Sequence, residues 1–408
     1  MNKIIKIFLL LIISIPVLSQ KYEFEPPLLY EYYFSQSDSG NGLFQFVYRI
    51  NYDKLFFTKD GESYTSNTRV TLELQDSSTS VISRTNDDKY ISVSTFDETL
   101  DKNKSVQGLL NINLEKKKYF AVLTLTDISA NKDFAFPKTS INLTEDLPKN
   151  YIVFSADGEK YYLANRRKTI PFSNTAYSLI YSSVKNEQKN DSLCLKFNSP
   201  TDSLTFCSAS TSNGNYILKD DSGGIYLSPV STFSDRSYLF KEISLKLPEG
   251  KFSVQGSGKD KTIFEVKWWD KPLSLLNYEI SLKALSIIES KTLVDSLKEL
   301  GNKLGYSAFN NYWKKYDPST NTTYNDLMAE YYTRVDYTQK TFSNFATPDG
   351  IMSDRGQIYI KYGPPLRVER SSAANGKNLE IWFYKGRNKP YYFRDNLGNG
   401  SYQLVKER

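Results

Sequence analysis

The sequence contains no histidine and has two cysteines among its 408 residues. Without histidine there is no Ser-His-Asp or Cys-His catalytic centre, and no histidine-ligated zinc or iron site. Two cysteines are too few to hold zinc or an iron–sulfur cluster by four thiolates. We therefore expect neither a metal nor a cofactor, and any catalysis would have to use Asp, Glu, Lys, Tyr or Ser side chains.

Long runs of charge of one sign are also missing. The 52 Lys and Arg residues and the 46 Asp and Glu residues are scattered along the chain, and they give a net charge of +6. Because no basic stripe stands out, we expect no nucleic-acid partner. The content of 39% hydrophobic residues is that of a globular protein, and the 31 tyrosines favour strands, where the ring packs well on a pleated face.

The N-terminal segment is too short for a transmembrane helix. Lys3 and Lys6 precede an apolar run of about 12 residues, whereas a membrane span needs roughly 20. Ser19 and the residue two before it suit a cleavage site, so residues 1–19 are predicted to be a signal peptide. No cysteine follows for lipid attachment, and we expect no transmembrane segment after signal removal. The mature protein is expected to be periplasmic, associated with the outer membrane, or secreted.

Short runs of alternating apolar and polar residues follow one another up to residue 268. Residues 44–52 and 70–74, for example, place an apolar side chain at every second position. Alternation over so many short segments, punctuated by Gly, Asp, Asn and Ser, predicts strands with one buried face. We predict two N-terminal immunoglobulin-like β-sandwich modules, residues 20–147 and 148–268. One large split sandwich is the alternative.

The two cysteines lie on either side of a predicted turn. Cys194 and Cys207 belong to two short apolar strands that flank a stretch of Asn, Ser, Pro, Thr and Asp, the pattern of a β-hairpin. They would then lie nearly opposite each other. In an exported protein such a pair is expected to form a disulfide bond, and two buried free thiols are the alternative.

After residue 268 the hydrophobic period changes from two to about 3.6. It predicts a helical linker, a helix or helix pair, over residues 273–304. A further helix should begin near Thr323, whose hydroxyl and the carboxylate of Asp326 approximate a capping box. After a turn, residues 357–363 predict a strand, which a hairpin and a last strand follow. We therefore predict a C-terminal α+β domain over residues 269–408, with a small, mainly antiparallel sheet.

Aromatic, acidic and glycine residues occur in a characteristic order in the C-terminal third. They are Trp313, Asp317, Pro318, Asn325, Glu330, Tyr331, Tyr332, Arg334, Val335, Tyr337, Phe342, Gly350, Asp354, Arg355, Gly356, Tyr359, Ile360, Tyr362, Gly363, Pro364, Glu380, Ile381, Trp382, Tyr384, Phe393, Asp395, Gly400 and Tyr402. With them, residues 268–404 resemble the GWxTD-domain family of exported bacterial proteins. At the naming motif the chain has Gly350-Ile351-Met352-Ser353-Asp354, so tryptophan is replaced. The resemblance implies a domain and a compartment, but no reaction.

Six residues of this region are candidate binding residues: Glu330, Tyr331, Arg334, Asp354, Arg355 and Trp382. Asp354 beside Arg355 could orient a polar substrate. The alternative is structural: Asp354 caps a turn, and Arg355 pairs with Glu330 or Glu380 to hold a helix on the sheet. An aromatic platform for sugar rings is a further hypothesis, although aromatic residues at strand spacing are more often core; its members would be Trp268, Trp269, Trp382, Tyr391 and Tyr392.

The leading functional hypothesis is a non-catalytic, exported cell-envelope protein. Its β-sandwich scaffold would present the C-terminal domain as a binding module for an envelope protein or a glycan. The alternative is a polysaccharide hydrolase that uses paired carboxylates, Asp354 with Glu330 or Asp317. A third hypothesis, a sorting signal for secretion at residues 400–408, conflicts with the place of that strand inside the family resemblance.

Overall fold

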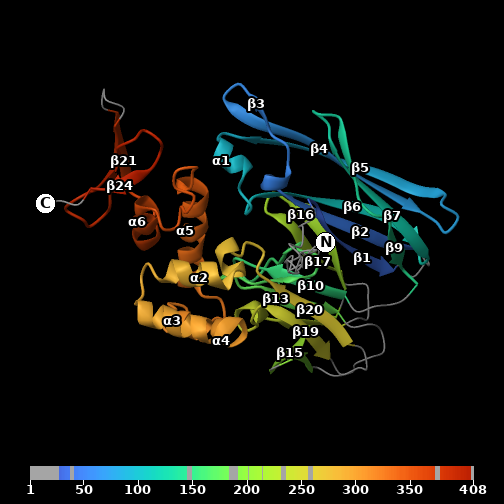
Figure 1. Ribbon diagram of the computed structural model, residues 1–408. Helices are drawn as coiled ribbons and strands as arrows, with labels where there is room; N and C mark the ends of the chain where they lie inside the picture. Colours follow the sequence, from blue (N-terminus) through green and yellow to red (C-terminus); the bar gives the residue numbers. More distant parts are fainter. Residues whose placement is uncertain are drawn as a thin grey trace, which may run out of the picture.

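The computed structural model describes residues 27–36, 41–144, 149–182, 192–200, 202–213, 215–230, 236–255, 261–372 and 377–405. The predicted signal peptide, residues 1–19, lies outside these ranges. Figure 1 shows most strands gathered on one side of the molecule, and the helices with a small sheet on the other. Within the described ranges, no helix has the length and apolar character needed to cross a membrane. The fold is multidomain, mostly β with a C-terminal α+β part, as predicted.

The first β module consists of two antiparallel sheets that enclose one core. One sheet holds β1 (Leu29–Gln36), β2 (Asn41–Asn51) and β6 (Ser105–Glu115); the other holds β3 (Thr58–Asp60), β4 (Ser63–Gln75), β5 (Val81–Val93), β7 (Lys118–Asp127), β8 (Lys132–Ala135) and β9 (Thr139–Asn142). Phe44 and Ile50 of β2 are fully buried against residues of β4 such as Leu72. The alternation seen in the sequence is therefore explained for β1, β2, β4, β6, β7 and β9, because one face of each of these strands lies in this core.

The second β module is built on one curved sheet. Its strands are β10 (Lys149–Phe154), β11 (Tyr162–Leu163), β12 (Ile170–Pro171), β13 (Ser178–Ser182), β14 (Ser192–Asn198), β15 (Ser203–Asn213), β16 (Asn215–Asp221), β17 (Gly224–Val230), β18 (Arg236–Phe240), β19 (Gly250–Gln255) and β20 (Lys261–Lys267). They follow the order β12-β20-β19-β14-β15-β18-β13-β10-β11-β17-β16. Phe197 and Phe264 from one half share a buried cluster with Leu179 and Tyr238 from the other, so the sheet bends over and its halves face each other.

The two β modules pack directly on each other. Tyr33 and Val47 of the first module lie in one buried cluster with Tyr151 and other residues of the second. At this junction the amide of Gln45 acts like a strand partner: its Nε2 donates to the carbonyl oxygen of Leu218 at 2.9 Å, and its Oε1 accepts from the Leu218 N–H at 2.8 Å. The three-stranded sheet of the first module is therefore covered on both faces.

Cys194 and Cys207 form a disulfide bond in the hairpin of β14 and β15. The two residues are direct cross-strand partners, and their Cα atoms are 4.0 Å apart. Both side chains lie on the exposed face of the hairpin, whereas their neighbours Leu193 and Leu195 point into the core. The bond therefore joins the strands from outside and does not take part in core packing.

The C-terminal part contains five α-helices and a four-stranded antiparallel sheet within the described residues. They are α2 (Tyr278–Leu285), α3 (Lys291–Glu299), α4 (Gly301–Lys314), α5 (Asp326–Phe342), α6 (Asp354–Tyr362), β21 (Arg367–Ser372), β22 (Asn378–Phe383), β23 (Tyr391–Asp395) and β24 (Tyr402–Leu404). Short helical turns also occur in the β modules, namely η1 (Tyr52–Lys54), α1 (Phe96–Thr99) and η2 (Ile243–Leu245), and η3 (Leu273–Leu276) precedes α2. Helices α2 to α5 extend the core of the second β module, and the small sheet has its own core.

The predicted strand at residues 357–363 is wrong, because this segment lies in the helix α6. The hydroxyl of Ser353 accepts a hydrogen bond from the Gly356 N–H at 3.0 Å and thereby caps the helix. Ile358 packs in the core of the small sheet and Ile360 in the core of the other helices. Two residues correspond to about 200° around a helix, so a helix buried on two opposite sides shows the alternation of a strand.

The predicted capping box at Thr323 is also wrong. The cap of α5 is Asn325, whose side-chain oxygen accepts a hydrogen bond from the Met328 N–H at 2.8 Å. The Thr323 hydroxyl donates instead to the carbonyl oxygen of Leu247 at 2.9 Å and so ties the loop before α5 to the second β module.

Candidate functional site

Residues 350–354 join α5 to α6 and are held by contacts with their own neighbours. A Cβ atom on Gly350 would lie 2.4 Å from the carbonyl oxygen of Thr338, so a larger residue would push this segment away from α5. Ile351 is 4% exposed and lies in the core formed by the helices. The hydroxyl of Ser353 donates to the carbonyl oxygen of Gly350 at 2.7 Å. These contacts give the segment a structural role.

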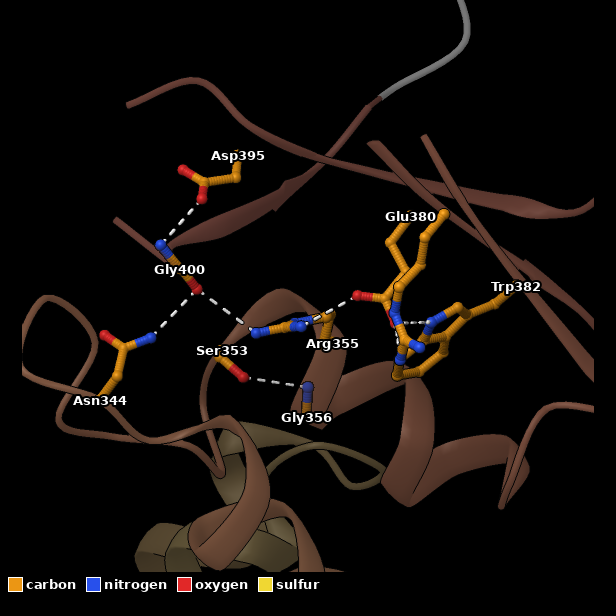
Figure 2. Close-up of polar contacts among 9 residues, drawn as sticks. Asn344, Ser353, Arg355, Gly356, Glu380, Trp382, Asp395 and Gly400 are labelled. Atoms are coloured by element: carbon orange, nitrogen blue, oxygen red, sulfur yellow. Dashed lines mark hydrogen bonds and ion pairs between the residues drawn. The ribbon is translucent and has the colours of Figure 1, made fainter. Parts of the chain in front are cut away.

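Arg355 lies at the centre of a polar network between α6 and the small sheet (Figure 2). Its Nη1 donates to Oε2 of Glu380 on β22 at 3.0 Å, and its Nη2 donates to the carbonyl oxygen of Gly400 at 3.3 Å. Glu380 also accepts a hydrogen bond from the indole N–H of Trp382 at 3.0 Å. The Arg355 guanidinium lies 4.1 Å from the ring centre of Tyr402. The network fixes α6 on the sheet.

Two aspartates hold the end of the chain in place. Asp395 is 1% exposed, and its carboxylate accepts hydrogen bonds from four backbone N–H groups, including those of Gly398 and Gly400, both at 2.8 Å. Burial alone would raise the pKa of Asp395, but these hydrogen bonds outweigh it and lower the pKa. Asp354 accepts a hydrogen bond from the Leu404 N–H at 2.6 Å. Both carboxylates therefore bind backbone of the last loop and strand.

The other three candidate residues lie on α5. Glu330 and Arg334 form an ion pair one helical turn apart, and Nη1 of Arg334 donates to the carbonyl oxygen of Ile360 at 3.3 Å. Tyr331 is 7% exposed, and its hydroxyl donates to the carbonyl oxygen of Ala284 at 2.7 Å. Tyr331 thus packs α5 against α2, and Arg334 contacts the end of α6.

The six candidate binding residues do not form one surface. Asp354, Arg355 and Trp382 take part in the hydrogen bonds that join α6 to the small sheet, whereas the other three lie along α5. The hypothetical aromatic platform is divided as well, because Trp268 and Trp382 belong to different buried clusters. Within the described part of the chain, no group of three or more Asp, Glu or Cys side chains could hold a metal ion.

A different group of side chains meets where α6 ends beside β22 and β23. Tyr362 and Tyr391 are stacked with ring centres 5.7 Å apart, and Tyr384 contacts both rings edge-on. The guanidinium of Arg387 lies 4.2 Å from the ring centre of Tyr362 and donates to the hydroxyl of Tyr391. We call these four residues, Tyr362, Tyr384, Arg387 and Tyr391, the Tyr–Arg surface.

The Tyr–Arg surface is cationic and partly exposed. Tyr362 is 40% exposed, and Lys361 and Arg387 are exposed as well. The hydrogen bond from Tyr391, with the positive charges of Arg387 and Lys361, lowers the pKa of Tyr362. Burial, together with the hydrogen bond to Tyr362, raises the pKa of Tyr391 to about 12. The surface thus offers aromatic rings beside positive charge.

Sequence reasoning missed this surface. Tyr362 and Tyr384 appear among the residues of the family resemblance and Tyr391 in the aromatic platform, but Arg387 was not singled out. In a chain with 31 tyrosines, composition does not distinguish these three from the rest. The family resemblance at Tyr362 and Tyr384 is the one signal that pointed to them.

The region that contains the Tyr–Arg surface and the Arg355 network matches a known protein domain. Residues 274–408 match the sequence profile of the GWxTD domain. The C-terminal third of this chain is a GWxTD domain. Its motif segment is the α5–α6 joint described above, in which Ile351 occupies the position of the motif tryptophan. The Tyr–Arg surface and the Arg355 network both lie inside the GWxTD domain.

Comparison of whole proteins adds little to this assignment. No curated protein matches the chain. Among solved structures, a β-glucuronidase from glycoside hydrolase family 2 is 8% identical with a TM-score of 0.20, and a Bacteroides uniformis β-glucuronidase is 8% identical with a TM-score of 0.21. The likeness covers 35% and 36% of this chain, and 13% and 16% of those chains. Likeness this slight carries no argument about function.

Proposed function

We propose that this chain is a non-catalytic, exported cell-envelope protein whose GWxTD domain binds another envelope protein through the Tyr–Arg surface. In this proposal the two β modules are a scaffold, and the Arg355 network keeps the binding surface rigid. The observation that carries the proposal is the partly exposed cluster of stacked tyrosines around Arg387 at the end of α6.

Export is supported by the sequence and by the cysteines. Residues 1–19 have the basic start, short apolar run and small residue at the cleavage position that signal peptides share. The disulfide between Cys194 and Cys207 suits an oxidising compartment, since cytosolic thiols are kept reduced. Periplasmic, outer-membrane-associated and secreted locations all meet this condition.

A non-catalytic role is supported by the partners of the conspicuous carboxylates. A glycoside hydrolase needs two carboxyl groups about 5–9.5 Å apart that flank the substrate bond. Glu330 is paired with Arg334, and Asp354 accepts a hydrogen bond from the backbone of the last strand. Asp317 accepts a hydrogen bond from the Ser319 N–H at 2.8 Å, which stabilises a turn. Each carboxylate already has the contacts of a structural residue.

A protein partner is supported by the chemistry of the Tyr–Arg surface. Tyrosine and arginine are enriched where protein interfaces gain most of their binding energy, because they bury much area and still form hydrogen bonds. Leu366 donates its backbone N–H to the carbonyl oxygen of Phe383, the residue before Tyr384, and its 77% exposed side chain adds apolar area there. Since Lys361, Lys385 and Arg387 are exposed cations here, the partner should present acidic side chains around an apolar patch.

The proposal can be tested by photo-crosslinking in intact cells. Benzoylphenylalanine would replace Tyr362 in one strain and, as a matched control, Tyr90 on β5, which is 69% exposed in the first β module. We expect a discrete adduct from position 362 and none from position 90. Mass spectrometry of the adduct should identify peptides of a second protein with an acidic surface.

A second variant tests whether the surface itself is responsible. Adding Arg387→Ala should remove most of the adduct, whereas Arg394→Ala, an exposed arginine on β23, should leave it unchanged. The proposal fails if position 362 gives no adduct, if the adduct contains glycan in place of a second protein, or if Arg394→Ala acts like Arg387→Ala.

A further inference from the structure

A cleft of about 590 Å³ lies between the second β module and the GWxTD domain. One wall comes from residues 245–249 and 268–271, and the other from α4 and the loop at residues 317–325. Clefts of roughly 300–1,000 Å³ at domain boundaries are common sites for small molecules. The cleft contains none of the six candidate binding residues and no member of the Tyr–Arg surface, so it is a separate site.

The shape of the cleft is fixed by hydrogen bonds across the domain boundary. The Thr323 hydroxyl donates to the carbonyl oxygen of Leu247 at 2.9 Å. Lys246 Nζ donates to the carbonyl oxygen of Asn321, also at 2.9 Å. These two contacts tie the loop at residues 317–325 to the β module on the opposite wall. A ligand would therefore enter a preformed site, which reduces the ordering cost of binding.

The inner part of the cleft is apolar and aromatic. Its lining includes Phe172, Trp268, Leu275 and Met328. The ring of Trp268 packs against Phe172, with ring centres 5.6 Å apart. The indole N–H of Trp268 is buried and has no acceptor among the described residues. Because this N–H is closed off from solvent, Trp268 offers a ligand in the cleft apolar surface and no hydrogen-bond donor.

The polar side chains of the rim come from α4. Asn310, Asn311 and Lys314 all line the cleft, and Lys314 lies one helical turn from both asparagines. All three side chains are exposed, and none makes a hydrogen bond or ion pair within the described structure. A carboxamide both donates and accepts hydrogen bonds, as a sugar hydroxyl does. The rim therefore matches a molecule with several hydroxyl groups.

The charged side chains around the cleft differ in whether they already have a partner. Lys271 is paired with Glu249 at 2.7 Å, and Lys246 is held by a backbone carbonyl. Asp317 accepts a hydrogen bond from the backbone of its own turn. Among the described residues, Lys314 has no such partner, so the rim has one positive charge available for a ligand anion.

We propose that this cleft binds a short saccharide that carries one carboxylate. The apolar inner wall would take the C–H face of a sugar ring, Asn310 and Asn311 would bind its hydroxyl groups, and Lys314 would bind the carboxylate. Two sources have this chemistry: uronic acid units of acidic polysaccharides, and N-acetylmuramic acid units of the cell wall whose lactyl carboxylate carries no peptide.

The test uses the full mature chain and three disaccharide probes. One contains glucuronic acid and N-acetylglucosamine, one contains N-acetylmuramic acid and N-acetylglucosamine, and the third is neutral N,N′-diacetylchitobiose, called chitobiose below. Saturation-transfer NMR, which reports on the ligand, gives the dissociation constant of each probe. We expect one or both acidic probes to bind more tightly than chitobiose, and the tighter one identifies the source. Lys314→Gln should weaken the acidic probes about fivefold and leave chitobiose unchanged.

The matched control is Lys315→Gln, a neighbouring exposed lysine that does not line the cleft. It should bind all probes like the native chain, and an Asn310→Ala, Asn311→Ala variant should weaken all three. These residues are exposed, so the variants keep the native fold. The proposal is overturned if no probe binds, if chitobiose binds as well as the acidic probes, or if Lys315→Gln has the same effect as Lys314→Gln. None of these results bears on the Tyr–Arg surface.

Discussion

Arg355 and Glu380 form an ion pair with 3.0 Å between Nη1 and Oε2, and their side chains are 14% and 4% exposed. Arg355 is the second residue of α6, and Glu380 lies in the middle of β22. The pair therefore connects the helix that follows the motif segment to the small sheet. Arg355, a candidate from the sequence for orienting a substrate, therefore has a structural role.

Removal of one partner of this pair should destabilise the GWxTD domain strongly. Arg355→Ala leaves the buried Glu380 carboxylate with Arg370 as its cation, which is 3.4 Å away and 74% exposed, so the cost should lie near the lower end of the about 3–5 kcal/mol typical of a broken buried ion pair. Arg394→Ala, on the exposed face of β23, should change the free energy of unfolding by less than about 0.5 kcal/mol. Urea unfolding followed by circular dichroism measures both values. If Arg355→Ala were as mild as Arg394→Ala, the pair would not hold the helix.

The altered motif position gives a second prediction. Ile351 is 4% exposed in a closed core, so Ile351→Trp, which restores the family residue, should overpack the core and cost about 1–3 kcal/mol. Met352→Trp, at a position that is 37% exposed, is the control and should change stability by less than about 0.5 kcal/mol. Thermal and urea unfolding report the difference. Greater stability of Ile351→Trp would mean that the core still has space for tryptophan.

The sequence predicted the β modules well because most of their strands are buried on one face. At residues 44–50 the alternating apolar side chains lie in the core between two sheets, whereas Gln45 and Val47 of the same strand are buried against the second β module. The same rule failed at α6, where Ile358 and Ile360 face two different cores. Periodicity reports which sides of an element are buried, and a helix between two cores shows the period of a strand.

The candidate site was harder to predict because its members come from distant parts of the chain. Arg355 and Glu380 are 25 residues apart, and the structural alternative for Arg355 already included Glu380 as a partner. The Tyr–Arg surface combines the end of α6 with the β22–β23 hairpin, and no local pattern marks Arg387. The position of Arg387 beside Tyr362 depends on how α6 lies on the small sheet. Because the sequence pattern predicts a strand for this segment, it could not bring the two residues together.

The disulfide should contribute stability through the cross-link alone. Cys194 and Cys207 are separated by 13 positions and lie on the exposed side of the hairpin, so replacing both with serine creates no cavity. A loop of about this size is expected to contribute about 3 kcal/mol. The free energy of unfolding of the double variant should therefore be lower by about 3 kcal/mol, and its urea midpoint should be lower as a result. Alkylation of the native chain should label no thiol before reduction and two after it; two labelled thiols before reduction would refute the bond.

The lowered pKa of Asp395 predicts how stability depends on pH. Because the pKa in the folded protein lies below the ordinary value of about 3.9, the ionised carboxylate contributes stability that is fully present above that value. This contribution is lost as the pH falls through the folded pKa, when protonation weakens the hydrogen bonds from Gly398 and Gly400.

Asp395→Asn removes the titrating group and keeps the shape of the side chain. The variant should be less stable than the native chain near neutral pH, because a neutral amide accepts these hydrogen bonds less strongly. As the pH falls from about 5 to 2, its free energy of unfolding should decrease less than that of the native chain, so the two curves converge. Urea unfolding at a series of pH values measures both curves. Parallel curves would show that the native Asp395 carboxyl has an ordinary pKa, and that its four backbone contacts do not favour the charged form.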